Sequence, residues 1–279
     1  MKPVRIGDKF IGPGHPTYVI AEAGVNHKGS LEAARRMIDE AKRAGADAIK
    51  FQTYKADKLV TRTAPRYWDD PEATGTQFAI FKRADCFDEN DYQALFQHAH
   101  NVGITWLSTA FDLDAVRFLD ELGMQAFKVA SADLTNYPLL MAVAETGKPV
   151  ILSTGASELA EVHAAVDFLR LHGCRDLVLL YCVLSYPTAD EDANLRRIQT
   201  LQNAFPEIPV GFSDHTVPDD CVIVPSAAVA LGAACVEKHF TLDRSLPGDD
   251  HYLSVDPVQL ATMVRNFRVI EKALGNPHF

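Results

Sequence analysis

Two histidines are placed in the sequence where they could bind one metal ion. His215 and His239 each stand at the end of a short apolar run, with one helical stretch between the two runs. If the runs pair as parallel strands, about 4.8 Å apart, both imidazoles can reach one ion. With a carboxylate such as Glu22 or Asp250 and open positions, this set suits a catalytic divalent metal. The alternative is two unrelated histidines with structural roles.

Two lysines are placed in the sequence where they could bind an anion. Lys50 and Gln52 are separated by one residue, so they point to the same side of a strand. Lys128 lies at an equivalent depth in a later run, and lysine binds carboxylate or phosphate as a point charge. Taken singly, such a lysine is more often a surface charge, and a serine at a strand end often only caps a helix. Hydroxyl donors to phosphate oxygens can come from Ser131, Ser153 and Ser213. Two further candidate substrate-binding residues stand at strand ends, namely Thr109 and Asp133.

These residues belong to a pattern that repeats along the chain. A short β-rich apolar run is followed by a polar turn and then by an amphipathic stretch. Most runs are apolar on both faces, which is typical of parallel strands covered by helices. The eight runs are 18–23, 48–53, 105–111, 126–131, 150–154, 177–182, 210–213 and 235–241.

The stretches between the runs have the apolar spacing of helices. Segment 31–44 is the clearest, with Ser30 as its N-cap and Gly45 as its C-cap. The other predicted helices are 88–102, 112–122, 157–172, 218–231 and 257–274.

Strands that alternate with helices predict βαβ units with right-handed crossovers. Eight such units match an α/β protein of the TIM (β/α)8 barrel type, and the 279 residues suit a single catalytic domain, 1–279. The alternative is an open doubly wound sheet, but no GxGxxG follows the first strand. Segment 4–12 predicts a short N-terminal hairpin that plugs the barrel floor, with Gly7 and Asp8 in its turn. Segment 55–87, after the second strand, is an unusually long loop.

The polar residues share one end of the predicted barrel. In such barrels the active site lies at the C-terminal ends of the strands, and every run carries polar groups there. Buried charges are costly unless they are paired or bound, so these ends together indicate a ligand site. Glu237 and His239 point to one side of the last run, whereas Lys238 points toward the helix layer or an ion pair.

The composition excludes several classes of protein. A formal net charge of −10 argues against a nucleic-acid partner, although a local cluster of lysines, histidines and metal can still bind an anion. No apolar run approaches about 18 residues and the first ten residues are polar, so we expect neither a membrane span nor a signal peptide. Five scattered cysteines without a CxxC pair are typical of a reduced, cytoplasmic protein.

The sequence resembles the sialic acid (N-acetylneuraminate) synthase family, in order from about residue 18 to residue 255. The resemblance implies a TIM barrel that condenses phosphoenolpyruvate with N-acetylmannosamine or a related aldose. The expected product is a 2-keto-3-deoxy sugar acid such as a nonulosonic acid, with phosphate released. The segments that carry the resemblance are IAEAGVNHKGS, AIKFQTY, LSTAFD, KVASADLTNYPLL, ILSTGAS, SYPT, GFSDHT, EKHFT and PGDDHYLS.

The resemblance also implies roles for the candidate residues. A divalent metal, manganese first with magnesium or cobalt as alternatives, would be held by His215 and His239. Glu22 would orient or deprotonate the water that attacks C2 of phosphoenolpyruvate. Lys50, Thr109 and Lys128 would hold the carboxylate of phosphoenolpyruvate, Ser131, Ser153 and Ser213 its phosphate, and Glu22, Gln52, Tyr186 and Asp250 would face the sugar.

Three features depart from the family pattern. Family members usually carry a C-terminal antifreeze-like domain whose arginine reaches the sugar site of the partner subunit, and this sequence ends at Phe279 without one. We therefore expect a homodimer or a separate partner that supplies the missing domain. Leu184 replaces an Asn or Ser and cannot hydrogen-bond a ligand, and Asp249 adds a carboxylate. Together these changes predict that the protein uses a different aldehyde acceptor, more than that it has lost its catalytic activity.

Other functions remain open from the sequence. One is a related phosphoenolpyruvate-condensing enzyme with a different aldehyde acceptor. Another is a non-catalytic barrel that binds a sugar or anion and needs a partner protein. A third is a Schiff-base aldolase, because barrel lysines can attack carbonyls. The loop 55–87, with Arg62, Arg66, Tyr67 and Trp68, is expected to act as a lid over the site.

Overall fold

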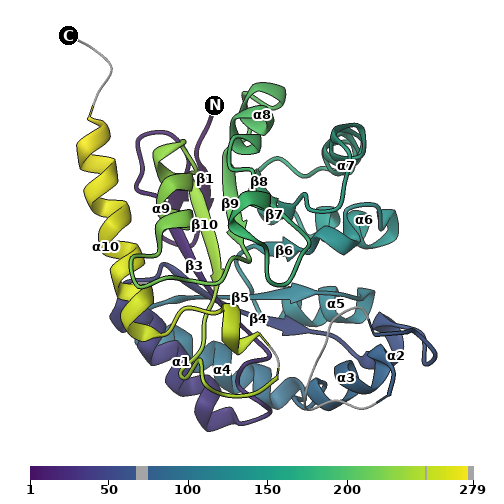
Figure 1. The fold of residues 1–279 in the computed structure, drawn as a ribbon. Coiled ribbons are helices and arrows are strands. Elements are labelled where there is room, and N and C mark those ends of the chain that lie inside the picture. The colour runs from purple at the N-terminus through teal and green to yellow at the C-terminus, as the bar shows by residue number, and fades with distance from the viewer. Residues whose placement is uncertain (67–74, 249, 276–279) are drawn as a thin grey trace.

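Eight parallel strands close into a barrel in the computed structural model, which describes residues 1–66, 75–248 and 250–275. The strand order is β10-β3-β4-β5-β6-β7-β8-β9, so consecutive strands pair and the last strand pairs with the first (Figure 1). This confirms the predicted α/β TIM barrel. The barrel strands are β3 (Tyr18–Gly24), β4 (Ala48–Thr53), β5 (Thr105–Ala110), β6 (Phe127–Val129), β7 (Val150–Ser153), β8 (Leu177–Cys182), β9 (Val210–Asp214) and β10 (Cys235–His239).

The strands are buried on both faces because side chains fill the barrel and helices cover its outside. Every residue of β3, β8 and β10 is buried, as the continuous apolar runs predicted. The helices surround the barrel in Figure 1. They are α1 (Leu31–Ala44), α4 (Glu89–Val102), α5 (Leu113–Glu121), α6 (Tyr137–Glu145), α7 (Leu159–Leu171), α8 (Arg197–Ala204), α9 (Ile223–Ala230) and α10 (Pro257–Leu274).

Local capping explains where the best-predicted helices begin and end. The Ser30 side chain accepts a hydrogen bond from the Ala33 amide, and Gly45 ends α1 in the left-handed conformation with φ 92°. Asp256 caps α10 by accepting from the Gln259 amide. Both helices have the bounds predicted from the sequence.

Among the helices that cover the barrel, α6, α8 and α9 differ most from the prediction. Helix α9 begins at Ile223 and not at residue 218, because Asp219 accepts hydrogen bonds from the amides of Cys221 and Ile223 and holds the preceding residues in a turn. Helices α6 and α8 were not predicted. Both are short, with 9 and 8 residues, and α8 has no side-chain cap. Helix α6 does have one, because the Asn136 side chain accepts from the Leu139 amide, and the prediction missed this start signal.

The segment after β4 is not the continuous loop that was predicted. It contains α2 (Ala56–Leu59) and α3 (Gln77–Ala84). Asp85 ties the segment together, because it lies 2.8 Å from Lys55 Nζ and 3.4 Å from Lys82 Nζ. Of the residues singled out in the sequence, Tyr67, Trp68 and Asp249 lie outside the described residues.

The predicted N-terminal hairpin is present. β1 (Val4–Ile6) pairs antiparallel with β2 (Lys9–Ile11) through a turn at Gly7, which has φ 62°. A side chain on Gly7 would meet Thr105 and Gln125, at the amino-terminal ends of β5 and β6. The hairpin therefore lies at the end of the barrel opposite the predicted active site.

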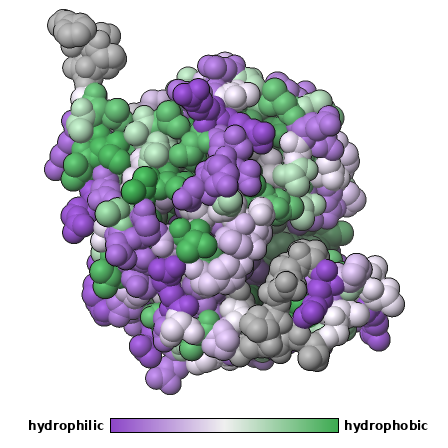
Figure 2. Space-filling view, in the orientation of Figure 1, coloured by the Kyte–Doolittle hydropathy of each residue, from purple (hydrophilic) through white to green (hydrophobic). Residues whose placement is uncertain are grey.

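The outer surface carries both hydrophilic and hydrophobic areas. Figure 2 shows hydrophilic residues over much of one face and a gathering of hydrophobic residues where α9 and α10 lie. Among the described residues, no helix combines the length and the apolar character that a membrane crossing requires. All five cysteines are free.

Candidate active site at the C-terminal ends of the barrel strands

All of the candidate site residues line one cavity of about 580 Å³. The cavity opens at the C-terminal ends of the strands, where closure of the barrel brings together residues that are far apart in the sequence. Its size falls in the usual range for small-molecule sites. The candidates that line it are Glu22, Lys50, Gln52, Thr109, Lys128, Ser131, Asp133, Ser153, Tyr186, Ser213, His215, His239 and Asp250.

Two lysines and two glutamates form an alternating network of buried charges at the cavity floor. Lys50 Nζ lies 2.6 Å from Glu22 and 3.9 Å from Glu237. Lys128 Nζ lies 3.4 Å from the other carboxylate oxygen of Glu237, and Lys50 donates a hydrogen bond of 3.0 Å to Thr109. Because all four charged side chains are almost completely buried, each charge depends on its neighbours for compensation.

The two glutamates titrate in different ranges. Burial raises the pKa of Glu22 to about 7, and the nearby charge of Glu237 adds to this, while Lys50 opposes it. Burial also acts against ionisation of Glu237, but Lys128 and Lys50 outweigh it and lower the pKa of that carboxyl. Gln52 donates a hydrogen bond of 3.1 Å to Glu22 and fixes its orientation. Glu22 can therefore exchange a proton near neutral pH, whereas Glu237 stays ionised.

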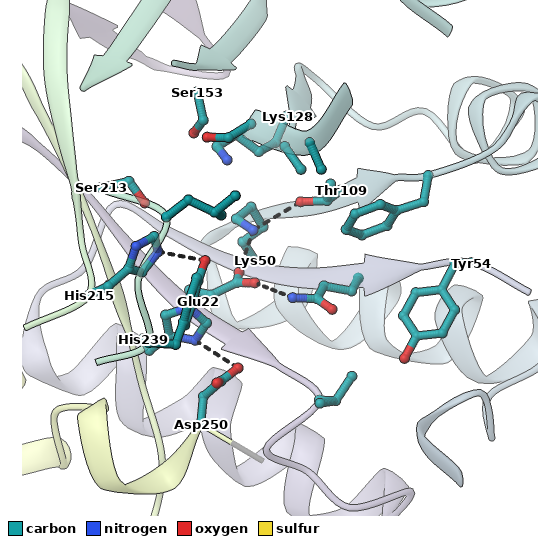
Figure 3. Close-up of a pocket in the computed structure, with 18 of the residues that line it drawn as sticks. Glu22, Lys50, Tyr54, Thr109, Lys128, Ser153, Ser213, His215, His239 and Asp250 are labelled. Atoms are coloured by element: carbon teal, nitrogen blue, oxygen red, sulfur yellow. Dashed lines mark hydrogen bonds and ion pairs between the residues drawn. The ribbon is translucent and has the colours of Figure 1, made fainter. Parts of the chain in front are cut away.

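The hydroxyl groups gather on the side of Lys128, as Figure 3 shows for Ser153. Ser153 Oγ is buried and finds no hydrogen-bond partner among the described residues. Ser131 Oγ accepts from the Gly155 amide at 2.9 Å, and Ser213 donates to Glu237 at 3.1 Å. A buried hydroxyl without a partner is costly, so Ser153 is a donor available to a ligand.

The two histidines face each other across the β9–β10 pair. Glu237 pairs with Ser213 and Lys238 with Asp214, and one residue further the His215 and His239 rings lie 5.6 Å apart between centroids. Burial lowers the pKa of His215 to about 4 and that of His239 well below its usual value. Both imidazoles are therefore neutral at pH 7, which is the form that binds metals.

The tautomer of His215 follows from its contacts. Its Nδ1 lies 2.8 Å from the carbonyl oxygen of Val183, which can only accept, so Nδ1 carries the proton. Nε2 is then an acceptor and receives the Tyr186 hydroxyl at 2.9 Å. Nδ1 of His239 lies 3.6 Å from Asp250 Oδ2 (Figure 3).

The donor set can be tested for its fit to a metal ion. The residues described include no group of three or more His, Cys, Asp or Glu side chains placed to hold one ion. Two neutral imidazoles face one cavity, with the ring of His215 oriented by a backbone carbonyl, as is usual for metal-binding histidines. A pair of this kind fits an open catalytic site in which water or substrate completes the coordination.

A second buried ion pair supports the histidines from behind. Lys238 Nζ lies 2.9 Å from Asp214 Oδ2, and both side chains are fully buried. These residues precede His239 and His215 in the chain, so they fix the two strand ends from the helix side of the sheet. The expectation that Lys238 points away from the cavity and into an ion pair is confirmed.

Sequence reasoning missed several residues of the cavity. Glu237 contacts both lysines. Its alternation with His239 in the sequence indicated that it faces the barrel interior, but it was not predicted as a site residue. Cys182 lies at the end of β8, with Sγ 3.0 Å from Ser131 Oγ. Nothing in the local sequence marks this cysteine as a site residue. An apolar group at the rim, which includes Tyr54, was missed as well.

The family model described as "NeuB family" matches residues 37–279. An uncharacterised protein of Methanocaldococcus jannaschii, MJ1065, is 46% identical over 99% of this chain and 77% of its own length. The N,N'-diacetyllegionaminic acid synthase of Legionella pneumophila is 40% identical over 97% of this chain and 76% of its own.

The solved structures agree with these matches. The N-acetylneuraminic acid synthetase of Leptospira borgpetersenii superposes with a TM-score of 0.89 and 37% identity, covering 100% of this chain and 92% of that one. A 3-deoxy-D-arabino-heptulosonate 7-phosphate synthase of Thermotoga maritima gives a TM-score of 0.74 at 16% identity, which reports the fold alone. On the strength of the family match and these identities, the chain belongs to the NeuB family.

Proposed function

We propose that this chain condenses phosphoenolpyruvate with an aldose to form a 2-keto-3-deoxy sugar acid, such as a nonulosonic acid, and releases phosphate. The observation that carries the proposal is the convergence of two buried lysines, an unpartnered buried serine and two neutral histidines in one cavity. The names of the relatives support it, because they include synthases of diacetyllegionaminic and pseudaminic acids and of N-acetylneuraminate 9-phosphate.

The anionic substrate would lie on the lysine side of the cavity. Lys50, Thr109 and Lys128 would hold the carboxylate of phosphoenolpyruvate, since the two cations and the hydroxyl already share one network. Its phosphate would lie against the hydroxyls of Ser131, Ser153 and Ser213. The glutamates keep the lysines ordered before the substrate arrives, so little reorganisation is needed on binding.

The acceptor sugar would lie between the histidines and Glu22. Gln52 and Tyr186 flank this part of the cavity, and Asp250 closes it near His239. We propose that His215 and His239 hold a divalent metal, manganese first with magnesium or cobalt as alternatives. When bound there, it would polarise the aldehyde oxygen as a Lewis acid.

Glu22 would act on the water that completes the reaction. The C2=C3 π pair of phosphoenolpyruvate forms a bond from C3 to the aldehyde carbon, which leaves positive charge at C2. The π pair of the aldehyde moves to its oxygen, which becomes a hydroxyl by taking up a proton equivalent to the one that the attacking water loses. Water attacks C2 while Glu22 takes a proton from it, a role that suits a carboxyl with a pKa of about 7. The tetrahedral carbon then breaks its bond to the phosphate oxygen, and phosphate leaves with the keto group formed.

A Schiff-base aldolase is disfavoured by the charge network. A lysine that attacks a carbonyl must be neutral. Lys50 Nζ lies 2.6 Å from Glu22 and Lys128 Nζ lies 3.4 Å from Glu237, so each amine would have to leave its paired carboxylate before it could attack a carbonyl carbon. Treatment with pyruvate and borohydride should therefore leave the protein mass unchanged.

The proposal is tested with metal-stripped protein, phosphoenolpyruvate and a panel of aldoses, with and without manganese. We expect manganese-dependent release of phosphate together with a 2-keto acid, in equal amounts. Lys128→Met is expected to abolish release, whereas Lys42→Met, an exposed lysine on α1, should leave it unchanged. Binding of phosphoenolpyruvate without release from any aldose would instead support a non-catalytic barrel that needs a partner. The oligomeric state and the cellular compartment stay predictions, and sedimentation of the purified protein measures the first.

A further inference from the structure

The turn between β3 and α1 holds a buried asparagine beside the cavity. Asn26 follows the last residue of β3 by two positions and is 6% exposed. It is not among the described residues that line the cavity. Its side chain instead contacts Phe240, which lies 214 residues further along the chain, just after β10. Asn26 therefore joins the first and the last strand of the barrel at the end where the candidate site lies.

The side-chain amide of Asn26 is engaged on both sides. Nδ2 donates hydrogen bonds of 2.9 Å to the carbonyl oxygen of Phe240 and of 3.0 Å to Ser254 Oγ. Oδ1 accepts a hydrogen bond of 3.2 Å from the backbone amide of Asp250. Because a carbonyl oxygen only accepts and a backbone amide only donates, these partners determine which way the side-chain amide points.

Ser254 closes these contacts into a ring. Its side chain is fully buried, and its hydroxyl donates a hydrogen bond of 2.7 Å to the carbonyl oxygen of Asp250. Since the hydroxyl has a single proton, Ser254 Oγ is the acceptor in its contact with Asn26. Both backbone polar groups of Asp250 are therefore held, the amide by Asn26 and the carbonyl by Ser254.

The ring fixes the segment that follows β10, which we call the β10 loop, residues 240–248 and 250–254. The loop leaves the barrel after His239 and returns at Val255, whose amide donates to the carbonyl oxygen of His239 at 2.8 Å. Lys28 adds an exposed contact from the same turn as Asn26, because its Nζ donates to the carbonyl oxygen of Pro247 at 2.7 Å. The turn after β3 thus holds the loop at a buried and at an exposed point.

The β10 loop carries a carboxylate at the edge of the cavity. Asp250 lines the cavity, and its Oδ2 lies 3.6 Å from Nδ1 of His239 (Figure 3). The Asp250 side chain is 28% exposed, so burial alone does not fix it. Its position follows from the backbone that Asn26 and Ser254 hold.

We propose that Asn26 is a positioning residue for the aldose, an inference that rests on the proposed function. Asn26 holds the backbone of Asp250 so that the carboxylate lies beside His239, where it can accept a hydrogen bond from a sugar hydroxyl. Asn26 itself does not touch the substrate. The lysines belong to a separate network, in which Lys50 contacts Glu22. Loss of Asn26 should therefore weaken the use of the aldose and leave the use of phosphoenolpyruvate unchanged.

The inference is tested by steady-state kinetics of Asn26→Ala, in which the two substrates are varied in turn. They are phosphoenolpyruvate and N-acetylmannosamine, or the best acceptor of the aldose panel. We expect the KM of the aldose to rise about tenfold or more, as for the loss of one hydrogen bond to a charged group. The KM of phosphoenolpyruvate should stay unchanged.

Other results of this experiment would overturn the inference. A merely structural role of Asn26 would lower the melting temperature or the active fraction and leave both KM values unchanged. That result, or an equal rise of both KM values, would refute the positioning role and leave the proposed function standing. Absence of phosphate release from the wild type with every aldose would overturn both.

Ser254→Ala provides a second test if Asn26→Ala does not fold. It removes only the hydroxyl between Asn26 and Asp250, so the KM of the aldose should rise several-fold while that of phosphoenolpyruvate stays unchanged. Because both side chains act through the backbone of Asp250, the double variant should raise the KM of the aldose by less than the product of the single effects. Effects that multiply would mean that the two residues act independently, against the inference.

Asn266→Ala is the matched control. Nδ2 of Asn266 donates to the carbonyl oxygen of Cys221 at 2.8 Å and lies 3.5 Å from Ser226 Oγ, so Asn266 has the same two kinds of partner as Asn26. It lies on α10 and outside the cavity. Its replacement should leave both KM values unchanged. A rise of the aldose KM as large as that in Asn26→Ala would show that the effect does not pass through Asp250, and would overturn the inference.

Discussion

At the scale of single residues, burial shifts the pKa values of the carboxyl and imidazole groups of the site in opposite directions. Burial keeps a proton on Glu22 up to about pH 7, and it keeps the imidazole of His215 neutral down to about pH 4. The same low dielectric therefore leaves, in one cavity, a carboxyl that can accept a proton near neutral pH and an uncharged imidazole. Such shifts are typical of functional sites.

The pKa of Glu22 predicts the pH dependence of activity. If Glu22 must be ionised to take a proton from water, kcat/KM should rise as the pH increases through about 7 in the free enzyme. Glu22→Gln should lose roughly a hundredfold or more in kcat and lose this acidic limb. A limb that persists in Glu22→Gln would assign the titration to another group.

The raised pKa of Glu22 also affects the stability of the fold, and this effect decreases as the pH rises, whereas the expected activity increases. A carboxyl whose folded pKa is about 7, above its ordinary value of 4.5, favours folding while it is protonated. The contribution of Glu22 to stability is therefore present below pH 4.5 and is lost as the pH rises through about 7. The pH at which Glu22 becomes an active base is thus the pH at which its burial is least favourable.

The metal proposal makes a prediction that does not depend on turnover. Replacement of His215 or His239 by Ala should weaken manganese binding by tenfold or more, on the order of what loss of a supporting contact already costs. Tyr186→Phe removes the hydroxyl that contacts Nε2 of His215 and should leave manganese binding as tight or make it tighter. Calorimetric titration of the metal measures all three, and unchanged affinity in both histidine variants would exclude this site.

At the scale of elements, the β9–β10 pair carries polar groups on both faces. His215 and His239 lie on the cavity side, and the Lys238–Asp214 ion pair lies on the helix side. A polar residue on the outer face of a barrel strand is unusual, because that face packs against helices. Its position directly behind the histidines suggests that the ion pair fixes the strand ends on which they depend.

Removal of one partner of this ion pair should be costly. Lys238→Met leaves Asp214 buried without its cation, and we expect the free energy of unfolding to fall by about 3–5 kcal/mol. The control is Arg170→Met on α7, which breaks an exposed contact to Glu207 and should cost less than about 1 kcal/mol. Urea denaturation measures both, and equal effects would mean that the buried pair contributes little.

At the scale of the whole molecule, the two ends of the barrel carry different features. The N-terminal hairpin packs at one end of the barrel, and all of the candidate site residues gather at the other. A heptulosonate synthase at 16% identity shares the barrel, so the fold by itself does not determine the substrate. We propose that the groups at the strand ends set the chemistry.

The sequence by itself determined the strands, most helices and the residues at the strand ends. The periodic signals are local, since apolar runs, caps such as Ser30 and the alternation of Lys50 with Gln52 depend on nearby residues only. Helices α6 and α8 were not predicted because they are short and their apolar periodicity is weak, and α8 also has no side-chain cap.

Only the tertiary structure decided which of these groups touch. Glu237 became part of the site because barrel closure places it between Lys50 and Lys128, which come from distant strands. The apolar side of the cavity exists because α3 folds back so that Phe81 packs on Tyr54, which follows β4 directly in the chain. Contacts of this kind join residues far apart in the chain, and their burial, which sets the pKa values, exists only once the barrel has closed.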